Sequence, residues 1–294
     1  MADTDTGASD GTGTPAAGAA PRSSRAGRNL PAAIGVGCLL GFGLIAILLF
    51  APYVWIGVVA VAMAVATVEV VTRLREGGFV IPIVPLLVGG QATIWLTWPF
   101  GAAGALGGFG GTVLVCLIWR LLAHGTKSAP TNYLRDVSVT VFLTAWIPLF
   151  GAFGVLLIYP ADGWARVLCM LLAVVFSDIG GYTAGVLFGK HPMVPAISPK
   201  KSWEGFAGSL LFGTIAAVLA VVFLLEQPAW VGIPLGILLV ITGTLGDLVE
   251  SQVKRDLGIK DMSTLLPGHG GLMDRIDSIL PSAAATWIVL AVLA

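Results

Sequence analysis

Charged residues are scarce in this sequence. Asp, Glu, Lys and Arg make up 11% of its 294 residues, whereas hydrophobic residues make up 56%. Soluble domains carry about 25% charged residues, so the composition excludes an ordinary soluble protein, which would have too little polar surface. The formal net charge is zero. The overall charge therefore identifies no partner, and we expect no nucleic acid among the partners.

The sequence also lacks two patterns that are typical of secreted proteins. It has three cysteines, each inside an apolar run and none in a CxxC or Cys/His cluster, so we predict neither a zinc site nor a disulfide framework. Residues 1–28 contain no apolar run of the kind that forms a signal peptide. Such a segment has little to bury, and we expect it to be a disordered cytoplasmic tail.

Long apolar runs, by contrast, fill most of the chain. A transmembrane helix needs about 20 predominantly apolar residues, and nine runs approach that length. We therefore predict an all-α, polytopic integral membrane protein with about nine transmembrane helices. The predicted helices cover residues 31–51, 54–72, 79–98, 102–122, 137–158, 164–187, 206–225, 229–246 and 275–294.

The distribution of Lys and Arg predicts the orientation of these helices. If the N-terminus is cytoplasmic and nine spans alternate, 15 of the 16 basic residues fall in cytoplasmic segments. Only Arg166 falls outside, and a miscounted span would scatter the charges over both sides. We therefore expect a multi-pass protein of the cell membrane with its C-terminus outside. Because the longer polar loops are cytoplasmic, we expect the active site on that side.

The first polar loop of interest covers residues 188–205 and contains the sequence Ser198-Pro199-Lys200-Lys201. Lysine side chains bind phosphate oxygens as point charges, so this loop is a candidate phosphate site. The alternative is a positively charged anchor on the cytoplasmic side of the membrane. Taken alone, the loop does not distinguish the two.

Two carboxylates, Glu69 and Asp178, lie inside predicted spans. A carboxylate within a membrane is costly and by default marks a functional site. For Asp178 the alternative is a structural hydrogen bond to Tyr182 or to a neighbouring helix. Both carboxylates are also compatible with a transporter. However, a transporter should concentrate polar groups near the middle of the bilayer, whereas the polar residues here crowd the cytoplasmic loops.

The second polar loop, residues 247–278, is denser in charge. Two acidic residues near its end, Asp274 and Asp277, are spaced i, i+3 at the start of the last span. Four residues at its beginning follow the spacing i, i+3, i+4, i+7, which places them on one face of a helix that continues the eighth span. These four are Asp247, Glu250, Ser251 and Lys254.

Two helix ends that present carboxylates to each other at the membrane surface suit a particular chemistry. Carboxylate oxygens bind Mg²⁺ in proteins, usually together with substrate phosphates, and interleaved Lys and Arg neutralise phosphate charge. This inventory is typical of phosphoryl or nucleotidyl transfer. The alternative is a solvated loop of salt bridges. Between the helix ends, residues 267–271 predict an irregular turn, in which His269 is a candidate base, metal ligand, nucleotide contact or structural residue.

These residues resemble a known family signature, that of the phosphatidate cytidylyltransferases or CDP-diacylglycerol synthases. The similar positions are Ser251-x-Val253-Lys254-Arg255, Lys260-Asp261, Pro267-x-His269-Gly270-Gly271 and Asp274-Arg275-x-Asp277. Further positions that resemble the family are Ser198-Pro199-Lys200-Lys201, Glu204-Gly205, Asp178, Tyr182, Gly185 and Phe188-Gly189-Lys190. The resemblance therefore covers residues 178–278 by motif, and the N-terminal half matches only as apolar spans.

The resemblance implies a polytopic helical enzyme that is often a homodimer. Such an enzyme condenses CTP with phosphatidic acid, a membrane lipid, and releases CDP-diacylglycerol and pyrophosphate. It uses Mg²⁺ or another divalent metal, and the sequence leaves open a monovalent cation as a further cofactor. A related CTP-dependent enzyme acting on another lipid phosphate or on a polyprenol is the alternative.

Carried over by position, three carboxylates are expected to bind the metal: Asp247, Asp274 and Asp277. Five residues are expected to be catalytic: Asp247, Asp274, Lys254, Lys260 and Arg275. Ten are expected to bind substrate: Asp178, Ser198, Lys200, Lys201, Glu204, Ser251, Arg255, His269, Gly270 and Gly271. Beyond the tail, the chain is expected to divide into N-terminal transmembrane helices over 29–160 and a catalytic transmembrane region over 161–294.

Overall fold

A computed structural model describes residues 41–293 of the chain, except 124, 126 and 266–269. Helices dominate this part, and seven of them are long and apolar enough to cross a membrane. The prediction of a helical membrane protein is thereby confirmed in its coarse form. The predicted tail, the first half of the first predicted span and His269 lie outside the described residues.

Helical elements make up the seven candidate spans, and a shorter apolar helix over Gly41–Phe50 precedes them. In chain order the elements are η1 (Pro52–Val54), α2 (Trp55–Glu76), α3 (Ile83–Leu121), α4 (Tyr133–Thr144), η2 (Ala145–Leu149), α5 (Phe150–Ile158), α6 (Gly163–Phe188), β1 (Pro192–Val194), β2 (Ser198–Ser202), α7 (Trp203–Leu224), α8 (Ala229–Asp256), α9 (Met273–Ile276) and α10 (Ile279–Leu293). The elements η1 and α2 form one span, α4, η2 and α5 form another, and α9 and α10 form the last.

Helix α3 folds back on itself at Gly101, whose backbone leaves the helical conformation with φ 57° and ψ −140°. The two arms run antiparallel, because Gly108 of the second arm lies against Thr93 of the first. A Cβ at Gly108 would lie 2.5 Å from the Thr93 Cα atom, so only glycine permits this approach. The predicted runs 79–98 and 102–122 correspond to these arms. The total of nine crossings stays a prediction.

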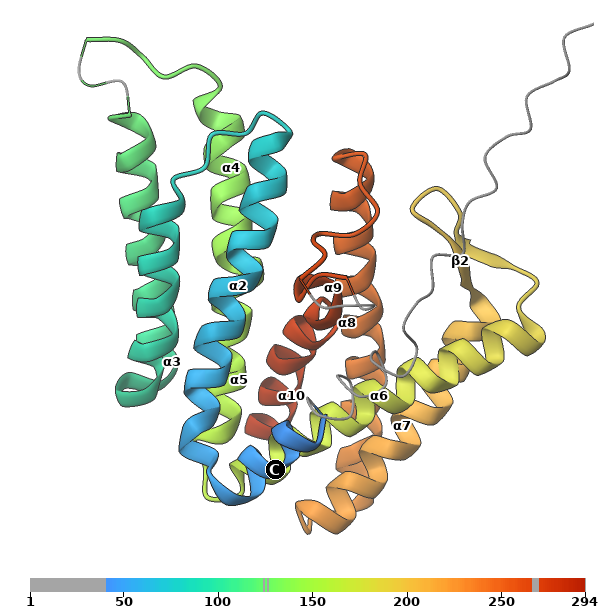
Figure 1. The fold of residues 1–294 in the computed structure, drawn as a ribbon. Coiled ribbons are helices and arrows are strands. Elements are labelled where there is room, and N and C mark those ends of the chain that lie inside the picture. The colour runs from blue at the N-terminus through green and yellow to red at the C-terminus, as the bar shows by residue number, and fades with distance from the viewer. Residues whose placement is uncertain (1–40, 124, 126, 266–269, 294) are drawn as a thin grey trace, which may run out of the picture.

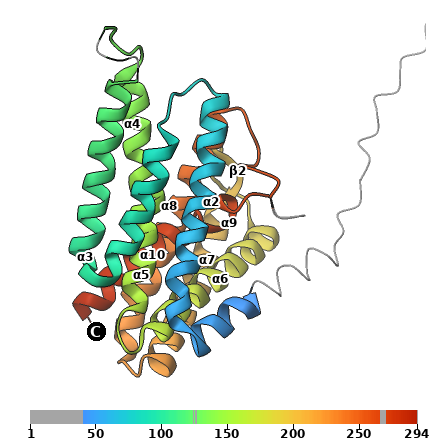
Figure 2. The same cartoon turned by 60° about the vertical axis from the view of Figure 1, so that its left-hand side comes forward.

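The helices form two groups that are joined by α10 (Figure 1). The first group contains α2 to α5, and the second contains α6, α7 and α8. Helix α10 packs against α5 of the first group and α8 of the second. Both views place the ends of α2 and α8 and the α3–α4 connection on one side of the molecule, together with the β-hairpin (Figures 1 and 2). The polar segments therefore meet at a single end of the bundle.

Closely spaced glycines bring α6 and α7 together. Gly180 of α6 faces Gly208 of α7, and a Cβ at Gly208 would lie 2.5 Å from the Gly180 carbonyl oxygen. In membranes, where hydrophobic burial adds little between helices, such small residues allow backbones to pack directly. The two helices thereby form a continuous wall beside α8.

A β-hairpin replaces the irregular loop predicted between α6 and α7. Strands β1 and β2 are antiparallel, with Pro192 opposite Ser202 and Val194 opposite Ser198. Prolines recur in this segment and prevent a helix, so the chain stays extended and pairs with itself. Strand β2 leads directly into α7, where the Ser202 hydroxyl accepts a hydrogen bond from the Gly205 amide at 3.1 Å. This small sheet is the exception to the all-α prediction.

Candidate active site

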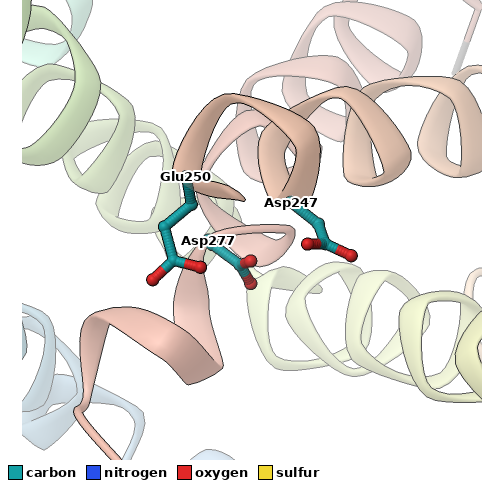
Figure 3. Close-up of side chains that lie close together, drawn as sticks. All are labelled: Asp247, Glu250 and Asp277. Atoms are coloured by element: carbon teal, nitrogen blue, oxygen red, sulfur yellow. The ribbon is translucent and has the colours of Figure 1, made fainter. Parts of the chain in front are cut away.

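Three carboxylates from α8 and from the start of the last span converge (Figure 3). Asp247 and Glu250 lie one turn apart on α8, and Asp277 follows α9. Each offers an oxygen atom, and these three atoms lie within 4.8 Å of one another. Gly246 makes the meeting possible, because a Cβ there would overlap the Asp277 carbonyl oxygen. The helical spacing predicted from the sequence therefore contributes to a cluster of side chains in the structure. We call Asp247, Glu250 and Asp277 the carboxylate cluster.

Burial makes this cluster a plausible cation site on physical grounds. Glu250 is 1% exposed and Asp277 is 7% exposed. Among the described residues, the Glu250 Oε1 atom is buried without a hydrogen-bond partner. Carboxylates held this close repel one another unless a cation or a proton lies between them. Three hard oxygen donors fit Mg²⁺, which takes carboxylate ligands together with water or phosphate oxygens.

Asp274 lies beside the carboxylate cluster and has its own set of partners. The Lys254 Nζ atom lies 2.9 Å from Asp274 Oδ1 and 2.6 Å from Glu250 Oε2. Asp274 Oδ2 accepts hydrogen bonds from the backbone amides of Met262 at 3.0 Å and Gly271 at 2.8 Å. The expected role of Asp274 in metal binding stays a prediction, and the structure adds Glu250 as a candidate ligand.

The hairpin contributes positive charge to the same place. Lys201 of β2 forms an ion pair with Asp247, with 2.5 Å between Nζ and Oδ2. The Ser251 hydroxyl donates to the other oxygen of Asp247 at 3.2 Å. Asp247 is therefore oriented from two sides while 40% of its side chain stays exposed.

A cavity of about 610 Å³ opens next to these groups. It is enclosed by α6, the hairpin, α7, α8 and the start of the last span. Apolar side chains form part of its wall, among them Val174, Val175, Phe206, Leu239 and Ile279. Basic side chains form another part: Lys200, Lys201, Lys254 and Arg275. A cavity with both kinds of wall suits a ligand that combines anionic groups with apolar chains.

The structure brings half of the predicted site residues to this cavity. Those that line it are Asp178, Lys200, Lys201, Asp247, Lys254, Asp274, Arg275 and Asp277. Among the described residues, those predicted to belong to the site but not lining the cavity are Ser198, Glu204, Ser251, Arg255, Lys260, Gly270 and Gly271. Their assignments to substrate binding or catalysis stay predictions.

Several of these outlying residues support the cavity wall. Glu204 accepts from the backbone amides of Lys190 and His191 and contacts His191 Nδ1 at 2.5 Å. Arg255 donates through Nε to the carbonyl oxygen of Ile197 at the hairpin turn, at 3.2 Å. Both contacts hold the hairpin against the helices, and the hairpin carries Lys200 and Lys201.

Two residues of the site were not assigned from the sequence. Glu250 shares a helix face with Asp247, so the spacing contained the signal for a third carboxylate in the cluster. Glu69 of α2 contacts the α8–α9 connection, where it accepts from the Leu272 amide at 3.0 Å and the Met273 amide at 2.9 Å. That contact joins residues about 200 positions apart, and no local pattern reveals it.

Comparison with known proteins identifies the family of this chain. The sequence pattern of the cytidylyltransferase family matches residues 32–293. A Mycobacterium bovis protein named phosphatidate cytidylyltransferase is 60% identical, over 100% of both chains. A Mycobacterium tuberculosis protein of the same name is 62% identical, over 93% of this chain and 86% of that protein. A third, from Mycobacterium leprae, is 58% identical over 100% of both chains. The chain therefore belongs to the cytidylyltransferase family.

Proposed function

We propose that this chain is a phosphatidate cytidylyltransferase. It transfers the cytidylyl group of CTP to phosphatidic acid, which gives CDP-diacylglycerol and pyrophosphate. The observation that carries the proposal is the cavity in which the carboxylate cluster, four basic side chains and an apolar wall meet. The relatives named phosphatidate cytidylyltransferase support the choice of substrates.

The reaction is a displacement at the α-phosphorus of CTP. A phosphate oxygen of phosphatidate forms the new P–O bond, and the bond to the bridging oxygen of the β-phosphate breaks. Pyrophosphate leaves with the electron pair of that bond. The attacking oxygen is already anionic, so the chain need not supply a strong general base. Its main tasks are to hold two anions in line and to offset their charge.

The basic residues of the cavity are suited to these tasks. Lys200 and Lys201 reach the site from the hairpin, and Lys254 and Arg275 reach it from the two helix ends. They bind phosphate oxygens of CTP and of the lipid and reduce the repulsion between the two. The apolar wall accommodates the start of the acyl chains, which otherwise remain in the bilayer.

The carboxylate cluster would hold the divalent metal. Asp247, Glu250 and Asp277 provide oxygen donors, and Asp274 is a fourth carboxylate next to them. When bound, Mg²⁺ would neutralise charge on the phosphates and on the departing pyrophosphate. Lys201 and Lys254 neutralise carboxylates in the structure described here, by ion pairs with Asp247 and Asp274.

The membrane placement follows from the distribution of charge. We propose nine crossings, with the N-terminus and the active site in the cytoplasm and the C-terminus outside, in the cell membrane. The gathering of polar connections at one end of the bundle supports this arrangement. A homodimer stays an expectation from the family resemblance, and a monovalent cation as a further cofactor stays open.

A transporter is less consistent with the structure. Glu69, which from the sequence resembled a carboxylate of a transport pathway, is only 8% exposed and is engaged with backbone amides of the α8–α9 connection. The charged residues predicted for the site, among them Lys201, Asp247 and Lys254, gather around the cavity at α8 and the start of the last span. These positions favour a reaction on a lipid headgroup at the membrane surface over transport of a solute across the membrane.

The proposed function is tested by turnover of the purified full chain in mixed micelles. Labelled CTP, phosphatidate and Mg²⁺ are supplied together and then omitted one at a time. We expect label in a lipid product only when all three are present, and we expect Asp247→Asn to abolish it. CTP binding without a lipid product from phosphatidate would contradict the choice of lipid substrate. A folded protein that neither binds CTP nor reacts with it would contradict the enzyme class.

A further inference from the structure

Glu69 lies outside the sequence motifs, yet it contacts both described ends of the α8–α9 connection. At one end, the Ser263 hydroxyl donates to Glu69 Oε1 at 2.5 Å. At the other, the amides of Leu272 and Met273 donate to Oε1 and Oε2 at 3.0 and 2.9 Å. One carboxylate therefore holds together two points of the chain that are about ten residues apart.

A second residue of α2 reinforces this contact. Arg73, one turn after Glu69, donates through Nε to the Met262 carbonyl oxygen at 2.7 Å. The amide of Met262 in turn donates to Asp274 at 3.0 Å. The Met262 and Met273 side chains are both fully buried. Helix α2 thus holds the peptide groups that hydrogen-bond to Asp274 at the edge of the carboxylate cluster.

The position of Gly271 shows how tightly the two carboxylates share this segment. A Cβ at Gly271 would lie 2.9 Å from Asp274 Oδ2 and 3.0 Å from Glu69 Oε2. The segment passes between Glu69 on one side and Asp274 on the other, and then enters α9. Because Asp277 follows α9 directly, the start of that helix sets where the third carboxylate of the cluster lies.

A buried carboxylate within a membrane helix is costly unless hydrogen bonds compensate for it. From the described residues Glu69 receives three, all at the α8–α9 connection. Replacing residues that orient metal ligands from behind typically weakens metal binding by about 10–100-fold. These two considerations indicate that the contact serves the site, in addition to joining the two halves of the chain.

We propose that Glu69 is a positioning residue for the carboxylate cluster, which it serves from α2 by anchoring both ends of the α8–α9 connection. The inference rests on the proposed function, because the cluster is the metal site of that reaction. It assigns to the N-terminal half, which carries no family motif, a direct part in building the active site.

The test uses the full chain in detergent micelles and two measurements that need neither CTP nor phosphatidate. Hydrogen exchange followed by mass spectrometry reports on peptides that contain Ser263, Leu272 and Met273. Thermal unfolding at increasing concentrations of Mg²⁺ alone reports on metal binding, because a ligand of the folded state raises the melting temperature. Both measurements are therefore independent of whether the chain makes CDP-diacylglycerol.

The main variant is Glu69→Gln, which keeps the size of the side chain but turns one acceptor into a donor. We expect faster exchange in the peptides around Ser263 and Met273, with α6 and α7 unchanged. We also expect the Mg²⁺ concentration for half of the thermal shift to rise by about 10–100-fold. Glu69→Asp, which keeps a carboxylate on a shorter stem, should recover part of the Mg²⁺ affinity.

Two further variants distinguish positioning from general stability. Gln91→Ala removes the hydrogen bond from Gln91 Nε2 to the Ala60 carbonyl oxygen, 2.9 Å, which also joins α2 to a neighbour but lies away from the cluster. It should leave Mg²⁺ affinity and exchange at Met273 unchanged. Ser263→Ala removes one donor to Glu69, and its effect should be smaller and non-additive with that of Glu69→Gln.

The proposal is overturned if Glu69→Gln retains wild-type exchange around Met273 and wild-type Mg²⁺ affinity. It is also overturned if Gln91→Ala changes both measurements as much as Glu69→Gln does, because the effect would then be one of general stability. If the wild-type chain binds Mg²⁺ as expected but forms no lipid product, the proposed function fails. The exchange and Mg²⁺ measurements then still decide whether Glu69 anchors the connection.

Discussion

Lys254 of α8 and Asp274 of α9 form an ion pair across twenty residues of sequence, with 2.9 Å between Nζ and Oδ1. The same ammonium group lies 2.6 Å from Glu250 Oε2. Lys254 therefore joins the carboxylate cluster to the residue beside it and fixes the two helix ends relative to each other. In the proposed reaction it is also a candidate partner for substrate phosphate.

Replacing Lys254 should destabilise the fold as well as abolish activity. In Lys254→Met the carboxylates of Glu250 and Asp274 lose their shared cation, and breaking a buried ion pair in this way costs roughly 3–5 kcal/mol. The free energy of unfolding in detergent micelles measures the effect. Arg166→Met is the control, because the Arg166–Asp162 pair is partly exposed and should contribute less than about 1 kcal/mol. An equal decrease in the free energy of unfolding in the two variants would contradict the structural role of Lys254.

Neutralising any one carboxylate of the carboxylate cluster should weaken metal binding. Asp247→Asn, Glu250→Gln and Asp277→Asn each remove a charged oxygen from the cluster, and each should weaken Mg²⁺ binding by more than the roughly 10–100-fold typical of residues behind the ligands. Thermal shifts with Mg²⁺ alone provide the measurement. Glu250→Gln is the most informative variant, since the family motif alone did not assign this residue. Unchanged Mg²⁺ affinity in Glu250→Gln would remove it from the metal site.

Gly271→Ala should damage the site through steric overlap. The added methyl group would lie 2.9 Å from Asp274 Oδ2 and 3.0 Å from Glu69 Oε2, and forcing extra volume into such a space costs about 1–3 kcal/mol. Loss of turnover together with a lower melting temperature is the expected result. Gly107→Ala in α3 is a matched control, because a Cβ there meets nothing within 4 Å. A Gly271→Ala enzyme with wild-type turnover would show that this segment tolerates displacement.

The hairpin contact between His191 and Glu204 should have a modest kinetic effect. The His191 side chain is 77% exposed and the Glu204 side chain 25% exposed, so water screens much of the attraction between them. We therefore expect His191→Ala and Glu204→Gln to raise KM for CTP by less than about tenfold, through small displacements of Lys200 and Lys201. Glu226→Gln, a glutamate in the connection before α8, should have no effect. A much larger loss in Glu204→Gln than in His191→Ala would indicate that Glu204 contacts substrate directly.

Local patterns in the sequence were sufficient for much of the architecture. Apolar runs predicted the helices, since the requirement to span a bilayer leaves few alternatives. Helical spacing placed Asp247, Glu250 and Lys254 on one face, and α8 does continue to Asp256, beyond the apolar run that ends at residue 246. These features depend on residues that are close together in the sequence, so hydrophobicity and helical spacing are sufficient to predict them.

The individual contacts between distant segments were not predicted. The pairing of Lys254 with Asp274 and the anchoring of Met273 by Glu69 need the packed bundle, because no spacing rule relates α2 to α9. The hairpin between α6 and α7 was read as a loop, since its short strands and prolines lack the alternation of a longer sheet. The pairing of its strands depends on where α7 begins. Because α7 starts at Trp203, Ser202 ends β2 and lies opposite Pro192.

The central claim, cytidylyl transfer to phosphatidate, is tested most directly by the position of the label in CTP. The full chain in mixed micelles with phosphatidate and Mg²⁺ receives CTP labelled at either the α- or the γ-phosphate. Our account predicts that α-label enters the lipid as CDP-diacylglycerol and that γ-label leaves as pyrophosphate. Transfer of γ-label to the lipid would instead show a kinase, and would contradict the account.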